Sequence, residues 1–346
     1  MNADRGNFKT ATAFVLGLAL LAGCAEKSPD APFQVYLDRL GRTLDVKVES
    51  PAAHRAVPRS PRPGKLRLGI PTDKLGTLDF MDLRGCELQV TIGKANSSLG
   101  RLARDSQKLL LALEYLNLAP NCITMLQAEG ELELANKLQQ AQAHKTTVLP
   151  ALIYNATLAS EEFQALWRPT PVTTDYPANT SSAVITALNN ISQAANRWLA
   201  GNYEANNLKF ELLLSEVSRG DAGQLWRALA HQGQWLDAAN TILAQRLQRG
   251  PLCQANLRPQ AADILPNVVR KYFVDAIQPR AAVLGRRYHQ VLPPVLTLEK
   301  RLLTSLPSRY LDWSEDRNSA FSALNDKPKQ HVRQLQKVLT PCQGNP

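Results

Sequence analysis

Apolar side chains recur at steps of three and four residues along most of this 346-residue chain. That spacing places them on one face of a helix, so it predicts helices at 33–48, 99–118, 129–144 and 181–203. The apolar clusters between 66 and 92 and the run at 208–214 leave helix and strand open, and helix is favoured for both. The pattern therefore predicts a mainly α, multi-helix globular domain.

Proline, glycine and capping residues divide this pattern into elements. Asn96-Ser97-Ser98 can cap the helix at 99–118, and Pro120 is expected to end it because proline lacks a backbone donor. Residues 223–247 are typical of a helical hairpin, with small and aromatic residues at Gly233, Trp235 and Ala238. Further helices are predicted at 160–167, 261–277, 280–291 and 295–306, then from a Ser314 cap, and last from Asp326 to Leu339.

The first residues carry a targeting signal. Arg5 and Lys9 precede an apolar run that ends in Leu21-Ala22-Gly23-Cys24. A basic start, a short apolar run and small residues are typical of a secretory signal peptide. The cysteine at this place makes a bacterial lipobox, which predicts removal of 1–23 and acylation of Cys24 by chains such as palmitate. An ordinary signal peptide cut near Gly23 and an uncleaved anchor are the alternatives.

Residues 24–32 then form a lipidated polar tether, and no later stretch comes near the roughly 18 apolar residues of a membrane span. Since Ala25, not Asp, follows the lipidated cysteine, we expect the inner leaflet of the outer membrane, facing the periplasm.

Three segments are expected after the tether. An N-terminal helix and a Pro/Arg-rich linker occupy 33–64, and an all-helical periplasmic domain occupies 65–346, with a boundary between two lobes near 168–178. The linker can lie on anionic headgroups or can simply be solvated.

Four cysteines remain besides Cys24, and an oxidising compartment favours two disulfides. Four cysteines allow three connectivities. We favour Cys86–Cys122 and Cys253–Cys342, because each pair stays within its own half of the chain. Zinc would need closely spaced cysteines, which the sequence lacks, so no metal is expected.

The net charge of +10 is concentrated towards the C-terminus, where 258–337 carries fourteen basic and seven acidic residues. Such a surface can attract anions, which in an envelope are lipid headgroups, glycan phosphates or acidic proteins and not nucleic acid. A solvated basic surface without a ligand is the alternative. The candidate anion-binding residues are Arg270, Lys271, Arg286, Arg287, Lys300 and Arg301.

Catalytic motifs are missing from the sequence: it has no nucleophile elbow, no zinc-protease motif, and no phosphate or dinucleotide loop. Glu114 is the one candidate acid, because apolar residues surround it in the sequence. A structural ion pair would explain it equally well. A cleft that exposes Glu114 would favour an enzyme, and a sealed core would favour binding or scaffolding.

Residues 78–123 carry Gly85-Cys86-Glu87-Leu88, Asn96-Ser97-Ser98-Leu99-Gly100, Ser106-Gln107 and Ala119-Pro120 with Cys122. In these features the chain resembles a proteobacterial lipoprotein family catalogued as a domain of unknown function. The resemblance implies a cell-envelope lipoprotein and brings no activity, cofactor or catalytic residue with it.

These observations favour a non-enzymatic, outer-membrane-anchored lipoprotein that binds an envelope protein, a glycan or an anionic lipid, without a cofactor. The alternatives are an envelope hydrolase acting on peptidoglycan or lipid, with Glu114 as its acid, and passive binding of anionic lipid through the basic last third.

Overall fold

The computed structural model describes residues 28–51, 58–71, 83, 85–169, 176, 180–254 and 257–342. The predicted signal peptide, Cys24 and most of the segment at 168–178 lie outside these ranges. Within them the regular structure is helical, apart from an isolated bridge between Gln254 and Leu257. The prediction of a mainly α fold is confirmed.

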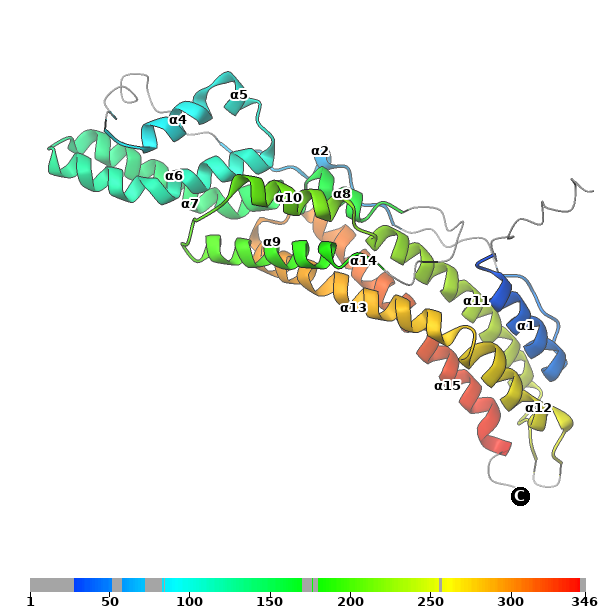
Figure 1. The fold of residues 1–346 in the computed structure, drawn as a ribbon. Coiled ribbons are helices and arrows are strands. Elements are labelled where there is room, and N and C mark those ends of the chain that lie inside the picture. The colour runs from blue at the N-terminus through cyan, green and yellow to red at the C-terminus, as the bar shows by residue number, and fades with distance from the viewer. Residues whose placement is uncertain are drawn as a thin grey trace, which may run out of the picture.

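The helices form an elongated, curved row in which three apolar clusters follow one another (Figure 1). The α-helices are α1 (Ala31–Leu44), α2 (Pro63–Leu66), α4 (Leu88–Asn96), α5 (Ser98–Arg101), α6 (Asp105–Ala128), α7 (Leu132–Ala156), α8 (Glu161–Leu166), α9 (Ala183–Leu199), α10 (Asn207–Ser218), α11 (Ala222–Gln248), α12 (Gln260–Val268), α13 (Gln278–Arg301), α14 (Ser308–Asn325) and α15 (Lys327–Leu339).

One end of the row is the hairpin core, made by α4 and the far halves of α6 and α7. The two long helices are joined at Gly130, whose φ of 84° is accessible to glycine at little cost. Leu88, Ala119 and Leu138 fill the space between the three helices. This core is thus built from one continuous part of the chain.

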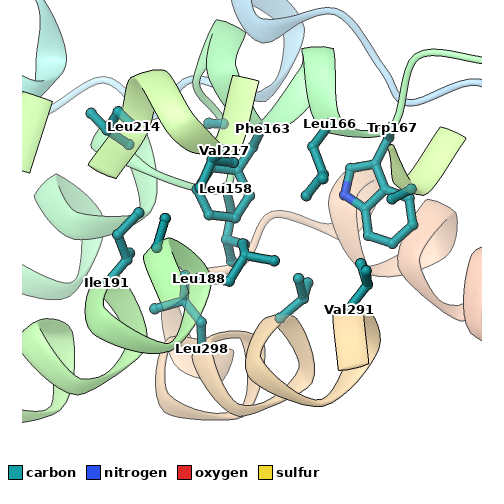
Figure 2. Packing of buried hydrophobic residues seen from close by; sticks show 14 of the residues in the cluster. Leu158, Phe163, Leu166, Trp167, Leu188, Ile191, Leu214, Val217, Val291 and Leu298 are labelled. Carbon is teal, nitrogen blue, oxygen red and sulfur yellow. The ribbon is translucent and has the colours of Figure 1, made fainter. Parts of the chain in front are cut away.

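The central core is the largest cluster (Figure 2). Leu158, Phe163 and Trp167 around α8 pack on Leu188 of α9, Val217 of α10, and Val291 and Leu298 of α13. The near halves of α6 and α7 and the first half of α11 also enter it. Because these helices are much longer than one core, they join the central core to its neighbours.

The terminal core unites the first and last described helices, since α1 packs on α11 and α12, and α15 packs on α11. Inside it, Tyr36 Oη lies 2.7 Å from His331 Nε2, and His331 Nδ1 lies 2.7 Å from Asn240 Oδ1. The amide oxygen only accepts, so Nδ1 donates to it and Nε2 accepts from the tyrosine. Burial lowers the pKa of His331 to about 3, which keeps the ring neutral.

The end of the predicted tether is fixed on the same core. The Asp30 carboxylate accepts hydrogen bonds from His231 Nε2 at 2.5 Å and from Trp235 Nε1 at 3.1 Å, both on α11. The N-terminal helix is therefore part of the folded body and is held by residues about two hundred positions away in sequence.

Several predicted breaks are wrong. Pro120 lies inside α6, and Pro293 and Pro294 lie inside α13. In α13 the two prolines deprive the carbonyls of residues 289 and 290 of helical partners, and both residues are exposed to water. Packing along the rest of each helix outweighs the local loss.

The predicted hairpin at 223–247 is instead one helix, α11, and Ser314 lies inside α14 and does not cap it. A Cβ on Gly233 would lie 3.1 Å from a methyl group of Leu324 on α14. This glycine thus permits close helix packing and makes no turn. The helices predicted at 160–167 and from Asp326 to Leu339 are confirmed as α8 and α15. In the structure, Ser160 caps α8.

Helix α6 also corrects the expectation that no later stretch approaches a membrane span. Among the described residues, α6 is the one helix that is long enough and apolar enough to cross a membrane, judged by length and composition. Its apolar residues pack instead against α4, α7 and the central core, and Leu109, Leu113 and Ala119 are completely buried. Packing within the protein therefore accounts for its composition.

Candidate functional site

Both favoured disulfides are formed. Cys86 and Cys122 have Cα atoms 5.6 Å apart in the hairpin core, and Cys253 and Cys342 have Cα atoms 5.1 Å apart in the terminal core. The first bond fixes the start of α4 on α6. The second fixes the C-terminal segment beside the loop that precedes α12.

A cavity of about 960 Å³ lies where the hairpin core meets the central core. Its walls are α4, α5, α6, α7 and the extended segment 67–71, which we name the strap. We refer to this space as the strap cavity. Its volume is at the upper end of the range of small-molecule sites.

Asn155 of α7 holds the strap in place. Its Oδ1 accepts from the Leu68 amide at 2.8 Å, and its Nδ2 donates to the Leu68 carbonyl at 2.9 Å. Both backbone groups of Leu68 are thus satisfied by one buried amide, as they would be in a strand pair. Arg67 adds an ion pair to Asp105 at 2.5 Å. These contacts make the strap a fixed wall.

The lining of the strap cavity combines an apolar wall with cationic residues. The apolar side chains are Leu68, Ile70, Ile92, Leu111, Val148 and Leu152. The charged ones are Arg67, Arg101, Lys108 and Lys145, against the single acid Asp105. Lys145 is placed by the ring of Tyr115, 4.9 Å from its Nζ. Such a lining can hold a hydrocarbon chain and a negative charge together.

Thr91 of α4 is a further residue of this lining. Its side chain is 1% exposed, and its hydroxyl has no hydrogen-bond partner among the residues that the structure describes. Buried hydroxyls are almost always bonded, so an unpartnered one beside a cavity is typical of a group that bonds a ligand or water.

The motif Asn96-Ser97-Ser98-Leu99-Gly100 forms the turn from α4 to α5 at the edge of this cavity. Ser97 Oγ accepts from the Gly100 amide at 3.0 Å and donates to the Lys94 carbonyl at 2.8 Å. The predicted cap therefore exists, but it caps α5 and not the long helix. A Cβ on Gly100 would lie 2.1 Å from the Lys94 carbonyl oxygen, so only glycine fits.

Glu114 lies in a different place, an open groove of about 1020 Å³ between α6, α9 and α10. Its side chain is 39% exposed and pairs with Lys94 at 3.3 Å. Glu204 lines the same groove, with the amides of Asn117, Asn190 and Gln193. Leu110 and Leu111 line the same groove, and Glu114 is partly exposed in it, so the acid is not sealed in the core.

The six basic candidates do not converge. Arg270 and Lys271 lie on the π-helical turn Val269–Val274, and Arg286, Lys300 and Arg301 are spread along α13. From Arg286 to Lys300 the helix rises about 20 Å. Arg287 is buried, with Nη2 2.5 Å from Asp221 Oδ1, so it is not available to a ligand.

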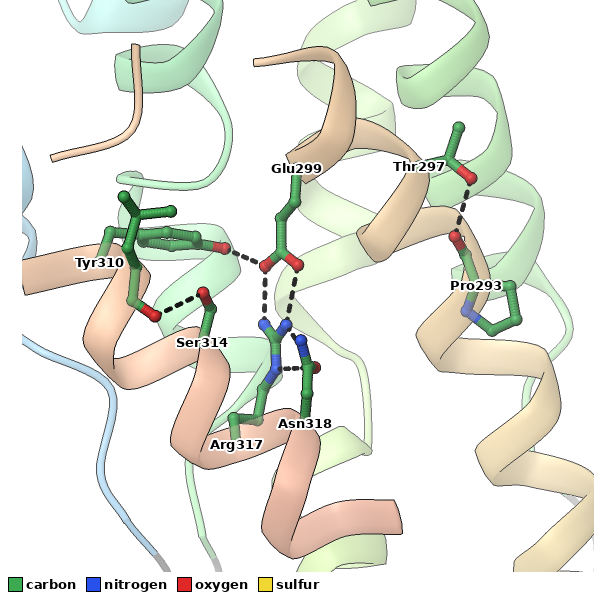
Figure 3. A network of polar contacts seen from close by, with 8 residues as sticks. Pro293, Thr297, Glu299, Tyr310, Ser314, Arg317 and Asn318 are labelled. Atoms are coloured by element: carbon green, nitrogen blue, oxygen red, sulfur yellow. Dashed lines mark hydrogen bonds and ion pairs between the residues drawn. The ribbon is translucent and has the colours of Figure 1, made fainter. Parts of the chain in front are cut away.

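Besides the pair of Arg287 and Asp221, the structure contains a second buried ion pair that no sequence pattern indicated. Glu299 accepts from Arg317 through both oxygens at 2.9 Å and from Tyr310 at 2.6 Å (Figure 3). The guanidinium lies 4.8 Å from the ring of Trp167. Burial would lower the pKa of Arg317, but the adjacent Glu299 carboxylate raises it, so the ion pair persists. Arg317 is completely buried, so this network stabilises the central core and reaches no ligand.

Within the described ranges, no group of three or more His, Cys, Asp or Glu residues could hold a metal ion. His331, the most buried histidine there, already bonds tyrosine and asparagine. The strap cavity is therefore the place where the described residues best fit a ligand.

The fold and cavity define an all-helical, disulfide-stabilised protein with a partly open cavity lined by apolar and cationic side chains. The chain belongs to the family described as "Protein of unknown function (DUF3080)", whose model matches residues 33–346. No curated protein and no solved structure matches it.

Proposed function

We propose that this chain is a lipid-anchored, non-enzymatic binding protein of the bacterial cell envelope, and that its strap cavity holds an anionic amphiphile. The observation that carries the binding site is the apolar wall of the cavity beside Arg101, Lys108 and Lys145. An acyl chain fits the wall, and a carboxylate or phosphate fits the cationic residues and the free hydroxyl of Thr91.

The location rests on the lipobox and on the two disulfides. Disulfides persist in oxidising compartments such as the periplasm. With Ala25 after Cys24, the anchor is expected in the inner leaflet of the outer membrane. Labelled palmitate should enter the wild-type chain and not a Cys24→Ala chain. An Ala25→Asp chain should move to the inner-membrane fraction, and unchanged fractionation would contradict this location.

Photolabelling of the full-length protein in membranes tests the cavity. A palmitate probe with a diazirine near its methyl end should form adducts on the strap and on α7. Val148→Trp fills the cavity and should reduce these adducts about tenfold. Leu213→Trp places the same bulk in the groove that contains Glu114 and should leave them unchanged. Equal labelling of both variants would overturn the assignment.

The charge of the ligand is tested separately. Lys145→Gln removes a cation and keeps most of the side-chain length. It should weaken labelling by the palmitate probe about tenfold and leave labelling by the methyl ester of that probe unchanged. Equal losses with both probes would mean that the cationic residues do not bind the carboxylate of the probe.

A second candidate function is an envelope hydrolase, because the groove exposes Glu114 and Glu204 as that hypothesis requires. The full-length protein should be incubated with peptidoglycan and with phospholipid, beside a Glu114→Gln variant. Turnover lost only in the variant would support the hydrolase. Equal turnover in both, or none in either, would exclude Glu114 as the acid.

A further inference from the structure

Two of the most exposed large apolar side chains lie on and directly after the short helix α5, next to its turn from α4. Leu99 is 84% exposed and Leu102 is 86% exposed. Single exposed leucines are ordinary on protein surfaces, but two on one short turn form a local apolar tip. The cavity proposal uses neither side chain.

The tip is a defined structure, which sets it apart from a poorly packed loop. Ser97 caps α5 through the Gly100 amide, and Gly100 lies directly against the backbone of residues 94 and 95. These contacts fix the turn that leads into Leu99 and Leu102. A sequence that merely needed a connection here would not require such a close approach.

The charges of the tip are of one sign. From Lys94 to Arg104 the chain carries Lys94, Arg101 and Arg104 and no acid. Lys94 pairs with Glu114 at 3.3 Å, and Arg104 lies 3.9 Å from Glu162. No ion pair of Arg101 occurs among the described residues, and it is exposed between the two leucines. Exposed leucine beside arginine is the combination that favours the interface of an anionic bilayer.

The beginning of α10 carries a second pair of exposed leucines. Gln107 Nε2 bonds Asn207 at 2.9 Å and Glu211 at 2.6 Å, which fixes the start of α10 beside the start of α6. On the exposed side of α10, Leu208 is 71% and Leu212 is 58% exposed.

The orientation of the molecule agrees with a membrane on this side. In Figure 1, α5, α10 and the start of α1 all lie on the upper side of the curved row. The predicted tether joins the folded body at the start of α1, where Asp30 is held by His231 and Trp235. The start of α1 and the tip thus lie on the same side of the row in this view.

We propose that Leu99, Arg101 and Leu102, supported by Leu208 and Leu212, dock onto an anionic bilayer surface as a second membrane contact besides the lipid anchor. The elongated body then lies along the membrane. Because Gly100 and Arg101 also line the strap cavity, docking brings the edge of that cavity to the lipid surface.

Site-specific photocrosslinking of the full-length protein tests this proposal. The chain is reconstituted through its anchor into vesicles of phosphatidylethanolamine and phosphatidylglycerol, with benzoylphenylalanine at position 102. A matched chain carries the probe at position 257, where Leu257 is 63% exposed at the other end of the molecule. Lipid adducts should be about tenfold more abundant at position 102.

Two substitutions separate the apolar and the electrostatic parts. Leu99→Ser should lower the adducts at position 102, because it removes apolar area from the interface. Arg101→Glu should lower them in the anionic vesicles and not in phosphatidylcholine vesicles. Both side chains are exposed, so thermal unfolding should remain unchanged and should confirm that the variants fold.

Equal lipid labelling at positions 102 and 257 would overturn the proposal, because anchoring alone would explain it. Adducts at position 102 that contain only protein would also overturn it and would assign the tip to a protein partner. Loss of the cavity labelling by palmitate would not affect this test, since the tip and the cavity have separate readouts.

Discussion

The hairpin and terminal ends of the molecule each have a small apolar core and one disulfide, yet they are built differently. The hairpin core comes from one continuous stretch of chain and borders on a large cavity. The terminal core joins residues as far apart as Tyr36 and His331 and encloses a satisfied polar cluster. One end is closed by contacts distant in sequence, whereas the other borders the strap cavity and carries Leu99 and Leu102, which are more exposed than Leu257 at the terminal end.

This difference indicates that the two ends have different roles. The terminal core fixes the start of α1, and with it the proposed tether, to α11 and α15. The hairpin end keeps the features expected of a binding surface. In the central core between them, Arg317 is the only charged residue among the described ones that is completely buried. It lies in a closed network with Glu299 and Tyr310.

The largest expected effect is removal of a disulfide. Cys253 and Cys342 are 89 residues apart, and Cys86 and Cys122 are 36 apart. The chain-entropy model gives upper values of about 4 to 5 kcal/mol for the first pair and about 4 kcal/mol for the second. Paired serine substitutions should therefore lower the free energy of unfolding by similar amounts in denaturant titrations.

Only the substitution of Cys86 and Cys122 should also reduce palmitate labelling, because α4 is a wall of the strap cavity. Loss of labelling in the Cys253 and Cys342 variant, measured where it is still folded, would show that the two ends are not independent.

Acid should weaken the terminal end first. In the folded state His331 stays neutral down to a pKa of about 3, whereas the unfolded chain binds a proton there below about 6.5. The unfolded state thus binds more protons, so stability present above about pH 6.5 is lost as the pH falls towards 3. The slope from this residue is about 1.4 kcal/mol per pH unit.

Denaturant titrations between pH 7 and pH 4.5, compared with a His331→Gln variant, measure that slope. Hydrogen exchange should show α1 and α15 opening before α6 and α7. Identical slopes in both proteins would exclude His331 as the source.

A smaller effect is expected at the turn of the hairpin end. Gly100→Ala places a Cβ 2.1 Å from a backbone oxygen, so it should cost roughly 1 to 3 kcal/mol and alter the tip. Gly69→Ala on the strap meets nothing within 4 Å and should change stability by less than about 0.5 kcal/mol. Thermal unfolding of the two variants gives the comparison, and equal losses would refute the close contact.

The smallest effect is expected at Glu114. Its ion pair with Lys94 is partly exposed, so Glu114→Gln should cost about 0 to 1 kcal/mol. A double-mutant cycle with Lys94→Gln measures the pair itself. A loss far above this range would show that Glu114 belongs to the structure of the hairpin end more deeply than its exposure indicates.

The sequence by itself determined the helical class, the pairing of the cysteines and the family resemblance, because these depend on local period, cysteine spacing and short motifs. It also predicted α8 and α15, whose capping serine and opening aspartate and proline are local signals. Location and lipidation remain predictions of the first 25 residues.

Only the tertiary structure decided where helices continue and which polar residues meet. Pro120 and Pro293 looked like breaks and 223–247 looked like a hairpin, yet packing on neighbouring helices continues α6, α13 and α11 through these positions. Glu114 looked buried by its neighbours in sequence, but the three-dimensional packing of α6 turned it to a groove. The strap cavity joins residues from 64 to 155, and no local pattern encodes such a meeting because it depends on how separate helices pack.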